Sequence, residues 1–149
     1  RGGDAAEALK GYQAVIDAAP ETTSAAEARF RMAKLHEAEG ATDQALALYE
    51  AAASSTHSDT AARAQFRLGE LYEGKGEHDK AARSFMQVVI LFLHEELSPQ
   101  ALWRAGENYK QAGNPAQARK AYEEVLRDYP DSEFATRATE SLQALAQGA

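Results

Sequence analysis

The sequence predicts an all-α fold in which antiparallel helix pairs stack on one another, an α-solenoid. A glycine recurs every 36 or 37 residues, an alanine follows each glycine by five residues, and an aromatic residue follows that alanine by four. Internal repeats of this length are typical of helical hairpins that cannot bury their apolar faces alone. The repeated residues are Gly3, Gly40, Gly76 and Gly113; Ala8, Ala45, Ala81 and Ala118; and Tyr12, Tyr49, Phe85 and Tyr122.

Each repeat unit is predicted to contain a first helix (A) and a second helix (B). The B helices are expected at 4–18, 42–54, 78–92 and 115–129, and the A helices at 24–38, 60–74, 99–112 and 133–147. The apolar run 88–93 resembles a buried strand by itself, but it lies in phase with the other B helices and is therefore assigned to one.

These ranges define a single repeat domain over residues 1–149. It contains three full repeats with boundaries near 22–58, 59–95 and 96–131, and half repeats at 1–21 and 132–149. Because the first B helix has no preceding A helix, we expect the domain to be a fragment of a longer protein.

The composition excludes several classes of function. Hydrophobic residues make up 44% and charged residues 26% of the chain, which is typical of a packed fold. There is no cysteine, so disulfides and thiolate zinc sites are excluded. The net charge of −7 argues against nucleic acid and anionic membranes as partners, since both favour basic surfaces. No apolar run approaches the roughly 20 residues that span a bilayer, so no membrane insertion is expected.

Small residues mark the expected crossing points of the helices in each pair. Three A helices share the order aromatic, arginine, apolar residue, small residue, and a larger side chain at the last position would push the helices apart. These segments are Phe30 to Ala33, Phe66 to Gly69, and Trp103 to Gly106. We expect the aromatic residues to fill the space between one helix pair and the next.

These residues resemble the tetratricopeptide repeat. Trp103, Gly106, Tyr109, Gly113, Ala118, Tyr122 and Pro130 match its consensus nearly position for position. The resemblance implies a right-handed superhelix of about three full repeats plus a half repeat at each end. It also implies a non-catalytic protein–protein interaction module that binds a peptide or flexible protein segment in a concave groove lined by A helices.

The length of the repeat and the segment 128–132 also resemble a bacterial subclass of the family. That subclass includes the periplasmic protein of the Tol-Pal system and lipoproteins of outer-membrane protein assembly. The sequence leaves the compartment open, and this resemblance favours the periplasm or cell envelope over the cytoplasm. The alternative function is a structural scaffold or oligomerisation domain of a bacterial cell-envelope or secretion complex.

The resemblance places the candidate partner-binding residues on the A helices. They are Glu27, Phe30, Lys34, Glu37, Arg63, Phe66, Glu70, Glu73, Gln100, Trp103, Glu107, Lys110 and Gln111. The aromatic members would either anchor a peptide or pack between repeats. Acids outnumber bases in this set, which favours a ligand with some positive charge. The arginines that follow the aromatics are expected to pair with nearby acids.

Ile90 and Leu91 form a second candidate surface. They stand where the last B helix has Arg127 and Asp128, so this helix end is more apolar than the repeat requires. An exposed apolar cluster would mark a docking surface or a homo-oligomer interface. The alternative is local packing against the divergent turn at 94–97.

No catalytic or metal-binding pattern is present in the sequence. None of the four histidines has a second ligand at helical spacing, and no nucleophile elbow or phosphate-binding loop occurs. We therefore predict that the protein is not an enzyme and needs no metal or cofactor.

Overall fold

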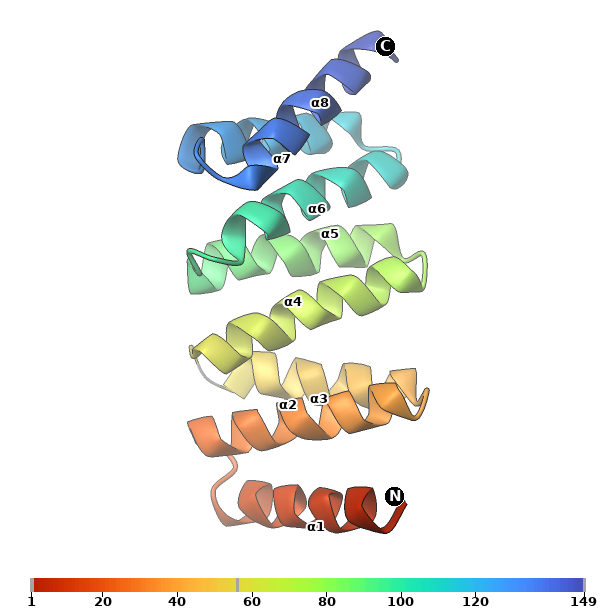
Figure 1. The fold of residues 1–149 in the computed structure, drawn as a ribbon, viewed down its shortest axis with the longest axis vertical. Helices are drawn as coiled ribbons and strands as arrows, with labels where there is room; N and C mark the ends of the chain where they lie inside the picture. Colours follow the sequence, from red (N-terminus) through yellow and green to blue (C-terminus); the bar gives the residue numbers. More distant parts are fainter. Residues whose placement is uncertain (1, 56, 149) are drawn as a thin grey trace. The chain divides into compact units, whose positions relative to one another are not determined.

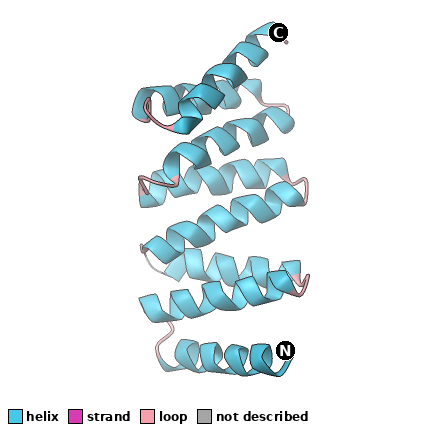
Figure 2. Cartoon of the chain, in the orientation of Figure 1, coloured by secondary structure: helices cyan, strands magenta, loops and turns pink. Residues whose placement is uncertain are grey.

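The computed structural model describes residues 2–55 and 57–148, and all of their regular elements are helices (Figures 1 and 2). They are α1 (Gly2–Ala18), α2 (Thr23–Ala38), α3 (Thr42–Ser55), α4 (Asp59–Gly74), α5 (His78–Gln87), the π-helical turn η1 (Val88–Phe92), α6 (Ser98–Gln111), α7 (Pro115–Asp128) and α8 (Glu133–Gln147). The predicted fold class is confirmed, and the helix boundaries agree with prediction to within one or two residues.

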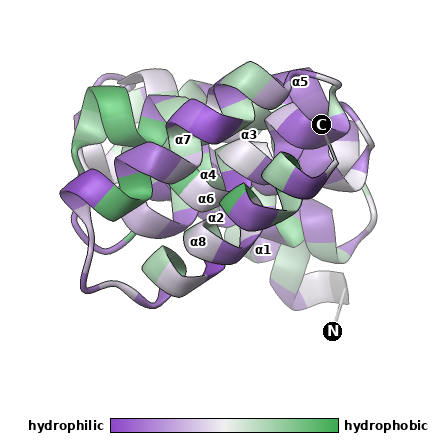
Figure 3. Ribbon diagram, turned by 90° about the horizontal axis from the view of Figure 1, so that it is seen from above, coloured by the Kyte–Doolittle hydropathy of each residue, from purple (hydrophilic) through white to green (hydrophobic). Residues whose placement is uncertain are grey.

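The chain divides into two compact units, Arg1–Leu68 and Gly69–Ala149, which we call the N-terminal and C-terminal units. The division falls within α4. In the N-terminal unit α2 packs against α1 and α3, and in the C-terminal unit α6 packs against α5, α7 and α8. Hydrophilic and hydrophobic residues are mixed along the helices, as expected for helices that each bury one face (Figure 3).

Three of the four periodic glycines end an A helix. Gly40, Gly76 and Gly113 have φ values of 75°, 72° and 78°, a left-handed conformation that glycine adopts without a Cβ penalty. The next amide then donates to the carbonyl five residues back, as in the bond from Ala41 to His36 at 2.8 Å. Gly3 differs because it lies inside α1 and ends no helix.

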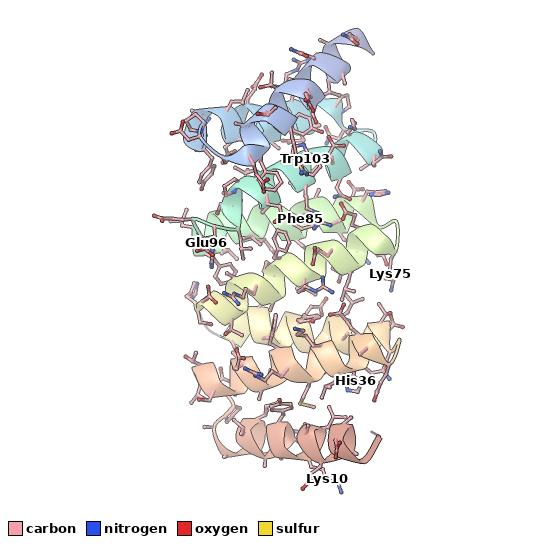
Figure 4. All side chains as sticks on the ribbon, viewed as in Figure 1. Lys10, His36, Lys75, Phe85, Glu96 and Trp103 are labelled. Atoms are coloured by element: carbon pink, nitrogen blue, oxygen red, sulfur yellow. The ribbon has the colours of Figure 1, made fainter. Side chains whose placement is uncertain are left out.

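The B-helix aromatics pack on the small residues of their own A helices. A Cβ added to Gly69 would lie 2.6 Å from the ring of Phe85, and one added to Gly106 would collide with the ring of Tyr122. Both rings are fully buried. Phe85 and Tyr122 therefore lie against the A helix of their own pair, and Phe85 also lies 4.9 Å from the guanidinium of Arg104 in the next pair. Figure 4 labels Phe85 on α5.

The B helix at 78–92 is helical as predicted, but its last turn is wider. An α-helix over His78–Gln87 changes to π geometry over Val88–Phe92, and Leu93 then adopts a left-handed φ of 47°. Val88 and Val89 point into the core, while Ile90 and Leu91 are exposed. In the described part of the chain, no helix is both long enough and apolar enough to cross a membrane.

We expect Gly106→Ala to destabilise the protein by about 1–2 kcal/mol, because overpacking against a fully buried ring outweighs the better helix propensity of alanine. The matched control is Gly11→Ala in α1, where a new Cβ meets nothing within 4 Å. This control should stabilise the protein by roughly 0.5–1 kcal/mol. Urea unfolding followed by circular dichroism measures both changes, and a stabilising Gly106→Ala would contradict the packing.

Candidate protein-binding surfaces

A groove of about 430 Å³ lies between α6 and α8 of the C-terminal unit. Both are A helices, so the groove lies on the surface where the sequence predicted partner binding. Figure 4 labels Trp103 on α6. The groove is lined by Trp103, Glu107, Lys110, Arg137, Glu140, Ser141 and Ala144.

Trp103 is half-buried, and three contacts hold its ring. The indole Nε1 donates a hydrogen bond to Oγ of Ser141 at 3.3 Å, and the ring centroid lies 5.9 Å from that of Phe134. The guanidinium of Arg137 lies 5.3 Å from the Trp103 centroid. Trp103 therefore packs between successive A helices and also presents part of its ring to the groove.

Glu107 is the centre of a polar network at the base of this groove. Its carboxylate accepts hydrogen bonds from Tyr122 at 2.6 Å, from Ser141 at 2.8 Å and from Lys110 at 2.6 Å. Burial opposes ionisation of Glu107, but bonds from Lys110, Tyr122 and Ser141 outweigh it and lower its pKa. Burial, reinforced by the bond to Glu107, raises the pKa of Tyr122 well above its usual range.

The N-terminal unit contains a related network around an acid at a different position of the repeat. The hydroxyl of Tyr49 on α3 donates a hydrogen bond to Glu37 of α2, and Arg67 on α4 forms an ion pair with the same carboxylate. Tyr49 is fully buried, and Phe30 meets its ring edge-on at 5.3 Å. Burial, followed by the bond to Glu37, raises the pKa of the Tyr49 phenol well above its usual range.

Arg104 joins two of the remaining groove acids. Its guanidinium pairs with Glu70 at 2.6 Å and with Glu73, while Nδ2 of Asn108 donates to Glu73 at 2.8 Å. The same guanidinium lies 4.9 Å from the ring centroid of Phe85. The expectation that Arg67 and Arg104 pair with nearby acids is confirmed, so these acids already have compensating charges and link successive A helices.

The other predicted residues are not gathered into one site. Phe66 is buried at 7% exposure and belongs to the core. Glu27 and Arg63 pair along their own helices with Arg31 and Asp59, each at 2.8 Å. Gln100 is half-buried, and Lys34 and Gln111 are exposed. Of the residues predicted from sequence, the groove brings together Trp103, Glu107 and Lys110.

Two family models described as tetratricopeptide repeat match residues 30–101 and 100–132. The chain belongs to the tetratricopeptide repeat family. No curated protein sequence matches it significantly.

Solved structures share the fold at low sequence identity. A tetratricopeptide repeat protein from Parabacteroides merdae is 20% identical with a TM-score of 0.72, covering 98% of this chain and 55% of its own. MamA is 21% identical with a TM-score of 0.69, covering 98% and 79% respectively. The Yersinia enterocolitica type III secretion translocator chaperone SycD is 22% identical with a TM-score of 0.61, covering 87% and 96%. The tetratricopeptide fold makes this chain a protein–protein interaction module.

Four groove residues of this tetratricopeptide protein, Arg137, Glu140, Ser141 and Ala144, were missed in the sequence. All four lie on α8, whose sequence departs from the order aromatic, arginine, apolar, small. The available signal was the repeat period, because Ser141 lies 37 residues after Arg104 and takes its place beside the glutamate of the preceding repeat.

The apolar cluster at the end of the third B helix is exposed. Ile90 is 65% exposed and Leu91 is 51% exposed, so the turn that follows does not cover them. Leu93, which the sequence analysis missed, is 74% exposed in its left-handed conformation. We call Ile90, Leu91 and Leu93 the η1 patch. Glu96, labelled in Figure 4, lies in the turn between η1 and α6.

We expect alkaline pH to weaken the fold through Tyr49 and Tyr122. Folding raises the pKa of both phenols above the value near 10 that a tyrosine has in the unfolded chain. Their contribution to stability is therefore fully present below pH 10 and is lost as the pH rises beyond it. Between pH 8 and 11 the native chain should lose roughly 1 kcal/mol per tyrosine more than the variant Tyr49→Phe with Tyr122→Phe.

Urea unfolding at both pH values measures this difference. Tyr12→Phe is the matched control, since Tyr12 has no hydrogen bond within the described residues. An equal loss of stability in the native chain and in the double variant would show that neither buried hydroxyl is linked to folding.

Proposed function

We propose that the α6–α8 groove binds an extended segment of a partner protein. The observation that carries the proposal is the partly exposed Trp103 ring beside Arg137. Tryptophan and arginine are the residues most enriched where binding energy concentrates in protein interfaces. The polar network around Glu107 holds the Trp103 ring through Ser141, so the anchor is positioned before a ligand arrives.

The groove favours a ligand that combines an apolar side chain with a hydrogen-bond acceptor. The acceptor would meet Arg137, whose guanidinium contacts two aromatic rings and forms no ion pair within the described residues. Of the two acids that line the groove, Glu107 is already paired with Lys110, whereas Glu140 forms no ion pair within the described residues. A positively charged group therefore has one groove carboxylate to meet, fewer than the charge count of the sequence implied, and an acidic or carbonyl group is favoured beside Arg137.

Trp103 is the single tryptophan of the chain, so its fluorescence reports on this groove directly. We expect a peptide library to contain binders that shift the Trp103 emission, and Trp103→Ala to weaken them about tenfold or more in calorimetry. Arg137→Gln should weaken the same peptides. Arg119→Gln, an exposed change on α7, is the matched control and should leave affinity unchanged. Binders that are indifferent to both groove variants would contradict the proposal.

The η1 patch supports a second candidate function, a scaffold that self-associates within a bacterial cell-envelope or secretion complex. Exposing three large aliphatic side chains is costly in water, and a leucine in a left-handed conformation adds strain. Strain of this kind is often retained where function needs it. A second copy of the chain that covers the patch would remove the cost of its exposure.

Light scattering tests the scaffold. If the patch forms a homo-oligomer, Ile90→Lys with Leu91→Glu should convert it to a monomer without changing the helical circular dichroism spectrum. Arg127→Ala with Asp128→Ala alters the equivalent positions of α7 and is the matched control. A native chain that is monomeric at high concentration, or an oligomer that survives the charged variant, would exclude this function.

A further inference from the structure

The η1 patch is a local departure from the repeat. Counted from the aromatic residue of each B helix, the other three repeats have no large aliphatic residue at the positions of Ile90, Leu91 and Leu93. The packing of a repeat therefore does not require aliphatic side chains here. The equivalent residues are Asp17, Ala18 and Pro20; Ser54, Ser55 and His57; and Arg127, Asp128 and Pro130.

Two acidic residues follow the patch directly in the turn before α6. Glu95 and Glu96 are exposed, and neither forms an ion pair within the described residues (Figure 4). Glu95 is two residues after Leu93, so their Cα atoms lie within about 7.6 Å of each other. The surface therefore combines exposed aliphatic side chains with uncompensated negative charge.

The turn that carries these acids is held in place. The amide of Leu97 donates to Nδ1 of His94 at 3.3 Å, and the amide of Ser98 donates to the carbonyl of His94 at 2.8 Å. Ser98 is fully buried. Both hydrogen bonds close the chain around Glu95 and Glu96, so the two carboxylates stay beside the patch before any ligand arrives.

We propose that the η1 patch, together with Glu95 and Glu96, binds an amphipathic helix of a partner protein. The helix carries aliphatic residues on one face and lysine or arginine on the flanks of that face. Its aliphatic face covers the η1 patch, and its cations pair with the two carboxylates. The surface shares no residue with the α6–α8 groove, so it is an additional interaction surface that is independent of the groove.

A helix suits this surface better than an extended segment does. Every regular element within residues 2–55 and 57–148 is a helix, so an extended segment finds no strand edge with which to pair its backbone there. A helix satisfies its own backbone hydrogen bonds. It also presents aliphatic side chains every three or four residues along one face.

Charge disfavours two other occupants of the patch. A second copy of the chain has a net charge of −7, and in a symmetric contact through the patch it would bring its own Glu95 and Glu96 beside the first pair. An anionic membrane meets the same repulsion. The self-associating scaffold and the basic helix thus compete for one patch, and the two acids favour the helix.

The probe is a labelled, helix-stabilised peptide with leucines along one face and lysines on both flanks. The control peptide has glutamine in place of every lysine. We expect the intact 149-residue chain to bind the lysine peptide about fivefold more tightly than the glutamine peptide in fluorescence anisotropy. Physiological salt is used, because it largely screens exposed charges farther away than about 8 Å.

The aliphatic part of the surface is tested by Ile90→Ser with Leu91→Ser. This variant gives the third repeat the residues that the second repeat has at Ser54 and Ser55. It should weaken the binding of both peptides about tenfold or more, because it removes the apolar surface that the helix covers. The helical circular dichroism should stay unchanged, since both side chains are exposed.

The acidic part is tested by Glu95→Gln with Glu96→Gln, which should abolish the preference for lysine. The matched control is Asp4→Asn with Glu7→Gln, which removes the same charge from exposed positions of α1 and should leave the preference intact. Trp103→Ala should also leave it intact. Failure of the α6–α8 groove and failure of this second surface are therefore distinguishable.

Four outcomes would overturn the assignment. The first is equal affinity for the lysine and glutamine peptides, or no binding of either. The second is a preference for lysine that survives Glu95→Gln with Glu96→Gln, or binding that survives the loss of Ile90 and Leu91. The third is self-association that Ile90→Ser with Leu91→Ser abolishes in light scattering, since the occupant would then be a second copy. The fourth is binding to phosphatidylcholine vesicles that the same variant abolishes, which would assign the patch to lipid.

Discussion

The contact between a B-helix ring and a glycine of its A helix sets the distance between the two helices. Phe85 on Gly69 and Tyr122 on Gly106 are contacts with no room for one additional carbon. Once this distance is set, the remaining small residues of the core can be fully buried without cavities. The alanine-rich composition follows from the same constraint, because larger side chains would separate the helices.

The A-helix glutamates fix how the packed helices are oriented. The apolar contact between a ring and a small residue leaves the two helices free to rotate against each other. The carboxylate of Glu107 bonds Tyr122 and Ser141 at once, so it fixes the orientation of its own helix pair and of the following A helix. Buried polar groups of this kind are stabilising only when all partners are present. The A-helix acids therefore act first as structural links, and partner binding must use the groups that these links leave available.

Two surfaces retain such groups, and they differ in chemistry. The α6–α8 groove offers an aromatic ring beside a guanidinium. The η1 patch offers aliphatic side chains alone. A repeat protein can therefore bind different partners on surfaces built from the same repeated positions, because each repeat departs from the pattern at a few residues.

The sequence by itself determined the number, type and boundaries of the helices. Its glycines recur where an A helix must end in a left-handed conformation, and its small and aromatic residues recur in phase. Each repeat therefore supports the helix assignment of the other repeats. Trp103 and the apolar residues Ile90 and Leu91 were also identifiable, because they stand out against the repeated pattern.

Only the tertiary structure decided which partners these residues have. The direction of the Phe85 and Tyr122 rings depends on how two helices cross. Glu37, Glu73 and Glu107 each bond a side chain that lies 30 or more residues away in the sequence. Exposure of the η1 patch follows from one wider turn and the left-handed Leu93, neither of which has a local sequence signal. Periodicity specifies what repeats along a chain, whereas contacts across helices depend on their geometry in space.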